Sequence, residues 1–387
     1  MQTDKNLKIW ILAGETSGDD IGAKLMKSLR KQHPHITFFG VGGSQMKKQG
    51  QLQLFPMDEL AVMGFIEVLP KLYKLLRLLT QAKESIRTLN PHVVVTIDSP
   101  AFSLRLLKKL KHMGIKRVHY VAPQVWAWHE NRVKKFPGLW DKLLCLFPFE
   151  KDFFLKWKLN SSFVGHPVLE NNTQAGNTNA FKEKYNISTK QPILLLMPGS
   201  RRSELPKLLP IFEKTFFLLR LKLSELIAII PTSPLAEKKV KHLVQNWPIQ
   251  PLIISDASDK LDAYTVADIA LTKSGTSTLE LALFKTPMVV AYRVNMLTAI
   301  IAKKLIKVPF VCIVNLLAGR EIVPELLQER CKPSVLADTL YNIMMDDRLK
   351  LCQYEGFAEV IQTLQAPGNN SPSEAAAHEI MTIIKSC

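Results

Sequence analysis

Residues 7–31 read LKIWILAGETSGDDIGAKLMKSLRK: an apolar run, a turn of small and acidic residues, and a stretch with helical spacing. An apolar run without a polar face is typical of a strand that is buried on both sides of a parallel sheet. The next helix would present unpaired backbone N–H groups at its N-terminus, and these favour an anion. The turn therefore has two open interpretations: a ligand site, or a tight turn at Gly14 and Gly18 in which Asp19 caps the helix.

The turn is neither of the two named phosphate-binding loops, because GxGxxG and GK[ST] are both absent from it. Its strand-turn-helix rhythm recurs along the chain. Strand-like runs are IWILAG, ITFFGVGG, HVVVTIDSP, RVHYVAP, KLLCLFP and SSFVGHP, and then PILLLMPGSR, LIAIIPTSP, PLIISDAS, DIALTKSG, PMVVAYR and VPFVCIVN. This rhythm predicts an α/β fold of two doubly wound, Rossmann-like domains that face a cleft at the carboxyl ends of their strands.

Composition places the boundary between the two domains. Residues 171–180 read NNTQAGNTNA, which is a linker composition. We expect a first α/β domain over 1–170, a linker region over 171–187 and a second α/β domain over 188–332. Residues 333–387 are predicted to form helices without strands, and these helices could cross back to pack on the first domain.

Charge and cysteine usage limit the class of protein. The net charge is +17, and residues 1–170 hold 26 Lys and Arg against 14 Asp and Glu. The first domain should therefore attract an anionic surface, either nucleic acid or lipid. Its basic residues are spread over several predicted helices without a zinc finger, basic arm or RNP-like strand, which disfavours nucleic acid. The five cysteines lack metal spacing, and no signal segment or membrane-length apolar run is evident, so we expect a cytoplasmic protein.

Asp98 ends the apolar run VVVTIDSP at the predicted tip of a strand. Its carboxylate could cap the next helix, or it could act as a general base if it faces the cleft. No second carboxylate stands at glycosidase-like spacing, and none is needed when the leaving group is a diphosphate.

The second domain also has a strand end followed by a turn and a helix start, in MPGSRRSELPKLLP, residues 197–210. Ser200 can cap the following helix, and Arg201 offers a forked donor for phosphate oxygens. The alternative is a capped helix with a solvated arginine, but the position at a strand end favours a ligand.

A similar turn lies in TKSGTSTLELALF, residues 272–284. Ser274, Gly275 and Thr276 form a hydroxyl-rich helix start that suits a diphosphate. Glu280 follows about one turn later and could accept hydrogen bonds from ribose hydroxyls. An exposed helix glutamate is the alternative for Glu280.

Seven motifs together resemble one enzyme family. AGETSGD, IDSPAF, APQVWAWHENRV, VGHPVLE, LMPGSRRSE, SGTSTLE and NLLAGREIVPELLQ resemble lipid A disaccharide synthase, an inverting glycosyltransferase of the GT-B fold. The resemblance runs nearly end to end. Ala122 and His129 stand where the family more often has Ser and Arg, and Lys273 stands where a small residue is expected. These departures bear on substrate specificity and not on the resemblance to the family.

The resemblance implies a reaction. It is the transfer of 2,3-diacylglucosamine from UDP-2,3-diacylglucosamine to the 6-hydroxyl of 2,3-diacylglucosamine 1-phosphate, giving the β-1,6-linked lipid A disaccharide 1-phosphate and UDP. In a single inverting displacement, Asp98 would take the hydroxyl proton, while Arg201 and the turn at 274–276 stabilise the departing diphosphate. No DxD-type metal motif is evident, so no cofactor is expected.

The resemblance also implies binding residues and partners. The sugar or acceptor side of the site would include Gly14, Glu15, Ser17, Gly18, Gln124 and Asn315. The role of Asn315 does not follow from the residues themselves. The expected partners are the two acylated glucosamines and the anionic inner face of the inner membrane, with no nucleic acid; a homodimer, with or without a swap of the C-terminal helices, is left open.

The stretch FIEVLPKLYKLLRLL, residues 65–79, is predicted to be a membrane-docking helix. On a helical wheel its apolar residues share one half and its basic residues the other, and only Leu78 breaks the division. A core-facing helix is the alternative, but a basic polar face and lipid substrates favour docking in the interface. The docking residues would be Ile66, Val68, Leu69, Leu72, Leu75 and Leu76.

Three rival functions remain at this stage. A peptidoglycan N-acetylglucosaminyltransferase shares the fold and a lipid-linked acceptor, but its first loop is richer in glycine and contains histidine. A UDP-sugar epimerase shares the architecture without needing a lipid-facing surface. A non-catalytic nucleic-acid-binding protein would use the basic first domain and leave Asp98 idle.

Overall fold

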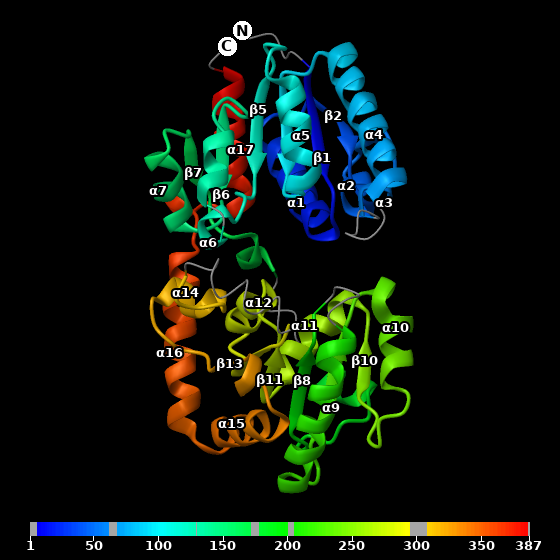
Figure 1. Ribbon diagram of the computed structural model, residues 1–387, viewed down its shortest axis with the longest axis vertical. Coiled ribbons are helices and arrows are strands. Elements are labelled where there is room, and N and C mark those ends of the chain that lie inside the picture. The colour runs from blue at the N-terminus through cyan, green and yellow to red at the C-terminus, as the bar shows by residue number, and fades with distance from the viewer. Residues whose placement is uncertain are drawn as a thin grey trace. The chain divides into compact units, whose positions relative to one another are not determined.

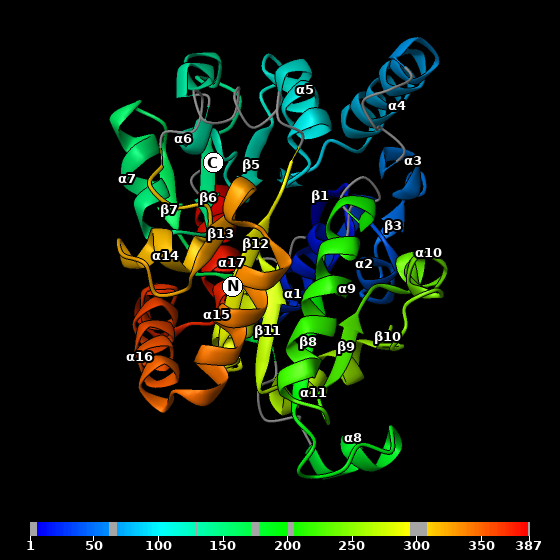
Figure 2. The same ribbon diagram turned by 60° about the horizontal axis from the view of Figure 1, so that its bottom comes forward.

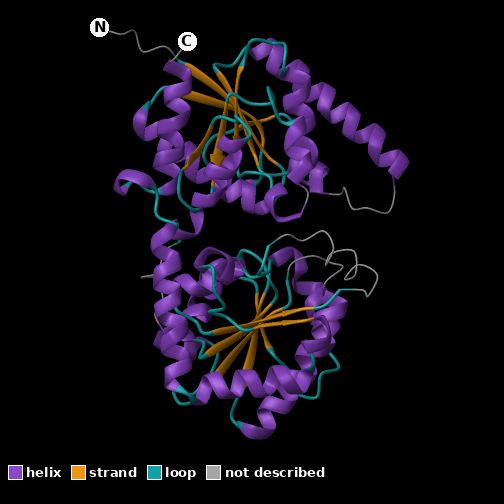
Figure 3. Ribbon diagram, turned by 60° about the vertical axis from the view of Figure 1, so that its left-hand side comes forward, coloured by secondary structure: helices purple, strands orange, loops and turns teal. Residues whose placement is uncertain are grey.

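The computed structural model describes residues 6–61, 68–128, 130–171, 178–199, 205–294 and 308–385. Contacts divide the chain into two compact units. Residues 1–170 and 364–387 make up the first unit, and residues 171–363 make up the second. In each unit the helices cover both faces of one sheet (Figure 3).

The first unit is built on a parallel sheet with the order β3-β2-β1-β4-β5-β6-β7. Its strands are β1 (Leu7–Ala13), β2 (Ile36–Val41), β3 (Leu52–Gln53), β4 (Val93–Ile97), β5 (Lys116–Tyr120), β6 (Lys142–Cys145) and β7 (Ser161–Phe163). Its helices are α1 (Thr16–Gln32), α2 (Ser44–Lys48), α3 (Asp58–Ala61), α4 (Val68–Leu89), α5 (Pro100–Leu110), α6 (Val125–Trp128), α7 (Pro148–Lys156) and α17 (Pro372–Lys385), with 3-10 turns η1 (Glu130–Lys135), η2 (Pro167–Glu170) and η4 (Pro367–Asn369).

The central strands β1 and β4 are mostly apolar because helices pack on both of their faces. All five residues of β4 are buried, as an uninterrupted run of Val, Thr and Ile predicts. On one face, α4 and α5 pack on Trp10, Leu12 and Val94. On the other face, α1 and α17 pack on each other, and Figure 1 shows α5 in front of the sheet and α17 behind it.

The second unit has a parallel sheet with the order β10-β9-β8-β11-β12-β13. Its strands are β8 (Ile193–Met197), β9 (Ile227–Pro231), β10 (Leu252–Ile254), β11 (Ile269–Thr272), β12 (Met288–Tyr292) and β13 (Glu325–Leu327). Its helices are α8 (Thr178–Lys184), α9 (Leu205–Lys222), α10 (Pro234–Val244), α11 (Ala257–Val266), α12 (Ser277–Leu283), α14 (Ile313–Ala318), α15 (Pro333–Met345) and α16 (Asp347–Thr363), with the 3-10 turn η3 (Gln328–Arg330). Helices α9 and α15 pack together on one face of the sheet, which is turned to the viewer in Figure 2.

The predicted strand at VPFVCIVN is wrong. Residues 308–312 form no strand, and α14 begins at Ile313. The backbone N–H groups of Val311 and Cys312 donate to the Glu325 carboxylate at 2.9 and 3.0 Å, so they are not available to a strand ladder. The sixth strand of the sheet is β13 instead.

The C-terminal helices divide between the two units. The α15 and α16 helices belong to the second unit, where Gln353 fastens α16 to β12 by accepting the Met288 N–H at 2.8 Å and donating to the Met288 carbonyl at 3.1 Å. The part of the chain that returns to the first unit, as considered above, is residues 364–387.

The α4 helix requires a correction to the predicted docking residues. Leu75 is 7% exposed and belongs to the core cluster under α4, together with Leu78 and Leu79. Leu76 and Tyr73 are 47% and 74% exposed. The positions 75, 78, 79, 82 and 86 follow helical spacing and face the sheet, so Leu75 is a core residue. Ile66 and the side chains of Val68, Leu69 and Leu72 lie outside what the structure describes.

No helix among the described residues is both long and apolar enough to cross a membrane.

Candidate active site

In the first unit, neighbouring strands bring the predicted site residues to one edge of the sheet. β1, β4 and β5 are adjacent and parallel, so the turns after Ala13, Ile97 and Tyr120 leave the sheet at the same edge. Gly14 begins the first of these turns and is buried. A Cβ at Gly14 would collide with the Ser99 side chain, so only glycine allows the two turns to approach so closely.

Asp98 and Ser99 both have a left-handed backbone, with φ values of 47° and 48°. Two successive non-glycine residues in this region are uncommon and cost of order 1 kcal/mol or more each. Surrounding hydrogen bonds hold them there: the Asp98 N–H donates to Tyr120 at 2.9 Å, and Ser103 Oγ donates to the Asp98 carbonyl at 2.7 Å. The N-cap residue of α5 is Ser99 and not Asp98, and Asp98 is half-buried at the strand end.

The GETSG turn divides into exposed and packed residues. Glu15 and Ser17 are exposed, whereas Gly18 is buried and lets α1 approach β1, because a Cβ there would lie 3.3 Å from the Ala13 Cβ. Asp19 does not cap its own helix. Its buried carboxylate accepts the N–H groups of residues 43, 45 and 46 at 2.8 to 3.0 Å, and so caps α2.

Gln124 is exposed and immediately precedes α6, in the loop that follows β5, the strand next to β4 and Asp98. The indole N–H of Trp126 donates to Glu150 Oε1 at 3.0 Å. Glu150 was not predicted from the sequence. The signal for it is Pro148 at the start of α7 with Glu three residues after Phe147, the spacing of a capping box without its usual Ser or Thr. Ala122 is buried, and His129 lies outside the described residues.

In the second unit, β8 and β11 are adjacent, so their following turns also leave the sheet together. The Lys273 N–H donates to the Met197 carbonyl at 2.9 Å, which holds Lys273 beside the end of β8. Ser200 and Arg201 themselves lie outside the described residues. Gly275 has no atom near the place of a Cβ, and Thr276 is exposed.

Two of the predicted nucleotide-binding residues already have protein partners. Ser274 Oγ donates to the Val311 carbonyl at 2.6 Å, which leaves its lone pairs for a ligand donor. Glu280 is half-buried and accepts from Tyr264 Oη at 3.1 Å and from Lys260 Nζ at 3.4 Å. Glu280 is therefore not the exposed helix glutamate that was its alternative interpretation.

Asn315 is fully buried, and its amide is fully used within the protein. Its nitrogen donates to the Val323 carbonyl and to Glu325 Oε1, and its oxygen accepts the N–H groups of Ile322 and Val323, all at 2.8 to 2.9 Å. An amide has two donors and one oxygen, so no capacity remains for a sugar. The structure thus corrects the predicted direct contact: Asn315 fixes the segment that contains Val311, the partner of Ser274.

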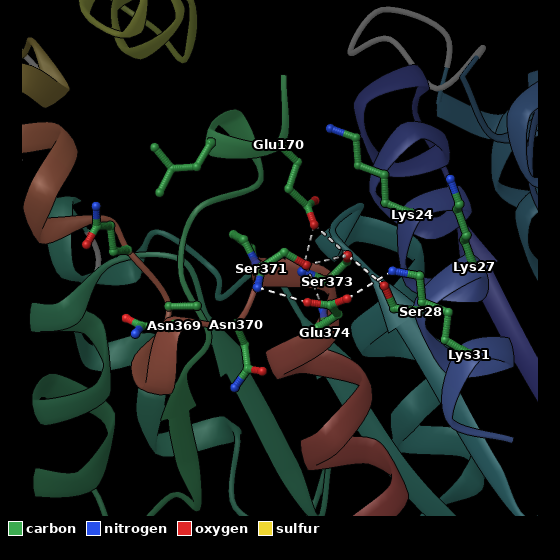
Figure 4. Close-up of a pocket in the computed structure, with 14 residues that line it drawn as sticks. Lys24, Lys27, Ser28, Lys31, Glu170, Asn369, Asn370, Ser371, Ser373 and Glu374 are labelled. Atoms are coloured by element: carbon green, nitrogen blue, oxygen red, sulfur yellow. Dashed lines mark hydrogen bonds and ion pairs between the residues drawn. The ribbon is translucent and has the colours of Figure 1, made fainter. Parts of the chain in front are cut away.

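A pocket of about 860 Å³ lies within the first unit, between α1 and the start of α17 (Figure 4). Lys24, Lys27 and Lys31 of α1 line it together with Glu170 and Glu374. Lys31 pairs with Glu374 at 3.0 Å, and Glu170 accepts a backbone N–H from the first turn of α17 at 3.1 Å. These contacts fasten α17 to the first unit, and none of the predicted site residues lines the pocket.

A family model places the chain among known enzymes. The model for lipid-A-disaccharide synthetase matches residues 9–380. The chain belongs to the lipid-A-disaccharide synthase family. Two relatives are similar to the chain over nine tenths or more of their own length. The lipid-A-disaccharide synthase of Gluconobacter oxydans (strain 621H) is 54% identical over 97% of this chain and 90% of that protein. That of Granulibacter bethesdensis is 48% identical over 97% and 98%.

Solved structures place this lipid-A-disaccharide synthase family member in the GT-B fold. The glycosyltransferase of kitacinnamycin superposes with a TM-score of 0.64 at 14% identity, over 98% of this chain and 99% of that one. The UDP complex of Staphylococcus aureus MnaA superposes with a TM-score of 0.62 at 15% identity, over 98% and 96%. At such identities the likeness shows the fold alone. The family shows that the chain is a glycosyltransferase of lipid A biosynthesis, as the motifs predicted.

Proposed function

We propose that the chain transfers 2,3-diacylglucosamine from UDP-2,3-diacylglucosamine to the 6-hydroxyl of 2,3-diacylglucosamine 1-phosphate. The observation that carries this proposal is the convergence of the GETSG turn and Asp98 at one sheet edge, in a chain of this family. The products would be the β-1,6-linked disaccharide 1-phosphate and UDP.

Asp98 is the proposed general base. It takes the proton of the acceptor 6-hydroxyl as that oxygen attacks the anomeric carbon from the face opposite UDP. The bond from that carbon to the diphosphate breaks in the same step, so the configuration inverts. The strained backbone at 98–99 supports this assignment. Residues in such backbone conformations are found most often at active sites, where the surrounding structure holds them in place.

The leaving group carries the charge that develops in this step. In the proposal, Arg201 and the turn at Ser274, Gly275 and Thr276 stabilise the UDP diphosphate, and Ser200 and Glu280 complete the nucleotide side. Glu15, Ser17 and Gln124, which are exposed at the edge of the first sheet, contact the sugars. The acyl chains and the basic first unit suit an anionic membrane surface.

The product tests the reaction, and chelation tests the leaving-group chemistry. With both acylated glucosamines supplied in detergent, we expect a disaccharide 1-phosphate whose new anomeric proton shows the β configuration by NMR. The yield should be the same in excess EDTA, because protein groups stabilise the diphosphate. An α-linked product would rule out single displacement, and loss of activity that Mg²⁺ restores would assign the diphosphate to a metal.

The comparisons support the alternative function, a UDP-sugar epimerase, only at the level of the fold. The UDP-GlcNAc 2-epimerase from Neisseria meningitidis has a TM-score of 0.61 but only 11% identity. The family match spans nearly the whole chain, so synthase chemistry is the better supported proposal.

A further inference from the structure

A buried carboxylate lies behind the α6 segment of the first unit. Glu150, in the first turn of α7, is 2% exposed. Its Oε2 accepts the backbone N–H groups of Leu146 and Phe147 at 3.0 and 3.1 Å, and its Oε1 accepts the indole N–H of Trp126 at 3.0 Å. The two backbone bonds close the capping arrangement of α7. The third bond joins α7 to α6, which is only four residues long.

Aromatic contacts extend this connection on both sides. The Trp126 ring meets Phe149 edge-on, with centroids 4.8 Å apart, and Phe149 stacks on Phe147 at 5.7 Å. Phe147 stacks in turn on His166 at 5.4 Å. Trp126 therefore joins α6 to α7 by one polar bond and one ring contact, and Glu150 supplies the polar bond.

The position of α6 explains why this bond matters. α6 follows β5, and the β5 residue Tyr120 accepts the backbone N–H of Asp98 at 2.9 Å. Gln124 is four residues after Tyr120 and is exposed at the same sheet edge as Asp98. A displacement of α6 would therefore shift Gln124 relative to Asp98.

We propose that Glu150 is a positioning residue: by binding the Trp126 indole it fixes α6, and with it Gln124, beside Asp98. This inference rests on the proposed function, in which Asp98 and Gln124 face the acceptor. Glu150 itself touches no reacting atom.

The chemistry of the carboxylate makes the bond sensitive to pH. Burial raises the pKa of Glu150 to about 7, although the hydrogen bonds from Trp126, Phe147 and Leu146 oppose that rise. Three other titratable groups lie near it. Burial raises the pKa of the Cys145 thiol, and Lys142, on the same strand β6, pairs with Glu379 at 3.0 Å. His166 stacks on the far side of Phe147.

Protonation of Glu150 places a new donor among three donors. A carboxylic acid needs an acceptor for its proton, and Trp126 and the two backbone N–H groups offer none. The protonated oxygen is a weaker acceptor than a carboxylate oxygen, so a bond at that oxygen weakens. The backbone N–H groups are fixed in the strand-to-helix turn, so the bond to the side chain of Trp126 is the one we expect to weaken.

Indole NMR of the unliganded protein tests the bond without any assay of function. With ¹⁵N-labelled tryptophan, the Trp126 indole signal is assigned by its absence in Trp126→Phe. In the wild type we expect this signal to move with a midpoint near pH 7, and in Glu150→Gln to stay constant. A Trp126 indole signal at the same position in the wild type and in Glu150→Gln from about pH 5.5 to about pH 8.5 would overturn the proposal, because the indole would then have no bond to that carboxylate.

Kinetics test the consequence for acceptor positioning. A glutamine at 150 must turn its NH₂ group toward a donor, and Trp126→Phe keeps the ring but removes the indole N–H. Each variant should lower kcat/KM for the acceptor by about 10- to 100-fold while the KM of the donor stays unchanged. The double variant should be no worse than the poorer single variant, because both remove the same bond.

A matched control separates the hydrogen bond from loss of an indole. Trp140 is also buried in the first unit, and its indole N–H has no partner among the described residues. Trp140→Phe should keep wild-type kinetics. Wild-type kinetics in folded Trp126→Phe, or additive losses in the double variant, would refute the positioning role. Failure of the proposed function would instead appear as no transfer in any variant, while the indole titration persists.

Discussion

The turn after β4 concentrates unusual features in two residues. Asp98 and Ser99 adopt left-handed backbones, and the neighbouring Gly14 is the residue that leaves room for Ser99. The sequence could indicate that Asp98 ends a strand, because the preceding run is apolar. It could not indicate the left-handed backbone, because the bonds from Tyr120 and Ser103 that hold it depend on the folded sheet.

Asp98→Asn tests the base at this position. An amide cannot accept the hydroxyl proton, so turnover should fall by about 10²-fold or more while UDP binding and the unfolding transition stay unchanged. The measurement is steady-state turnover beside UDP affinity by calorimetry. Asp152→Asn, which makes the same change on the exposed face of α7, should keep full activity. Turnover near the wild-type rate in folded Asp98→Asn would make Asp98 a structural acid.

Polar residues with distant partners were the hardest to interpret from sequence. Asp19 was considered as a cap for its own helix, yet it caps α2, which begins 25 residues later. Asn315 was assigned to the sugar site, yet Val323 and Glu325 occupy its amide. In both cases the residue type was informative, but the partner is set by tertiary packing.

At the scale of elements, α4 shows where helical spacing is ambiguous. Its apolar residues fill one whole half of the wheel, so spacing alone could not separate the core stripe from an exposed one. The structure assigns Leu75, Leu78 and Leu79 to the core and exposes Tyr73 and Leu76. Membrane docking through the exposed face of α4 remains a prediction.

Adjacent leucines on α4 test that prediction with the same substitution. Leu76→Ser, combined with Tyr73→Ser, should weaken binding to vesicles that contain anionic phosphatidylglycerol by about tenfold, with unchanged stability, because exposed apolar area is lost. Vesicle sedimentation measures the binding. Leu75→Ser should instead lower the free energy of unfolding by about 2 kcal/mol or more. Undiminished sedimentation of the double variant would place the docking surface elsewhere.

At the scale of the whole molecule, the alternation of apolar runs and helical stretches was sufficient to predict all strands of the two sheets except the edge strands β3 and β13. Parallel strands buried on two faces are visible as continuous apolar runs, and β4 and β8 are fully buried examples. The edge strand β13 was missed because its residues Glu325–Leu327 form a short run, while the more apolar VPFVCIVN contributes to no strand. The division of the last helices depends on long-range contacts such as Gln353 with Met288.

Buried histidines should make the first unit sensitive to acid. Burial lowers the pKa of His166 to about 3 and that of His119 to about 4, below the unfolded value of about 6.5. The unfolded chain therefore binds more protons below pH 6.5. The stability that these groups contribute is present above pH 6.5 and is lost as the pH falls toward their folded pKa values.

His166→Asn isolates one of these contributions. Asparagine can still accept the Val168 N–H, which His166 Nδ1 accepts at 3.1 Å, but it does not titrate. Between about pH 7.5 and about pH 5, the variant should lose about 2 kcal/mol less than the wild type in urea unfolding. Tryptophan fluorescence reports mainly on the first unit, because Trp247 is the only tryptophan of the second. Protonation of Glu150 changes the free energy of unfolding equally in both proteins, so it does not contribute to the difference between their pH profiles. Parallel pH profiles would contradict the burial argument.

The release of UDP tests the central claim, transfer between two acylated glucosamines, most directly. Purified protein in detergent is given UDP-2,3-diacylglucosamine alone, 2,3-diacylglucosamine 1-phosphate alone, or both, and free UDP is measured by chromatography. We predict UDP release at a significant rate only when both are present, in equal amount to the disaccharide formed. Equal release from the donor alone, or none with both substrates, would contradict the account.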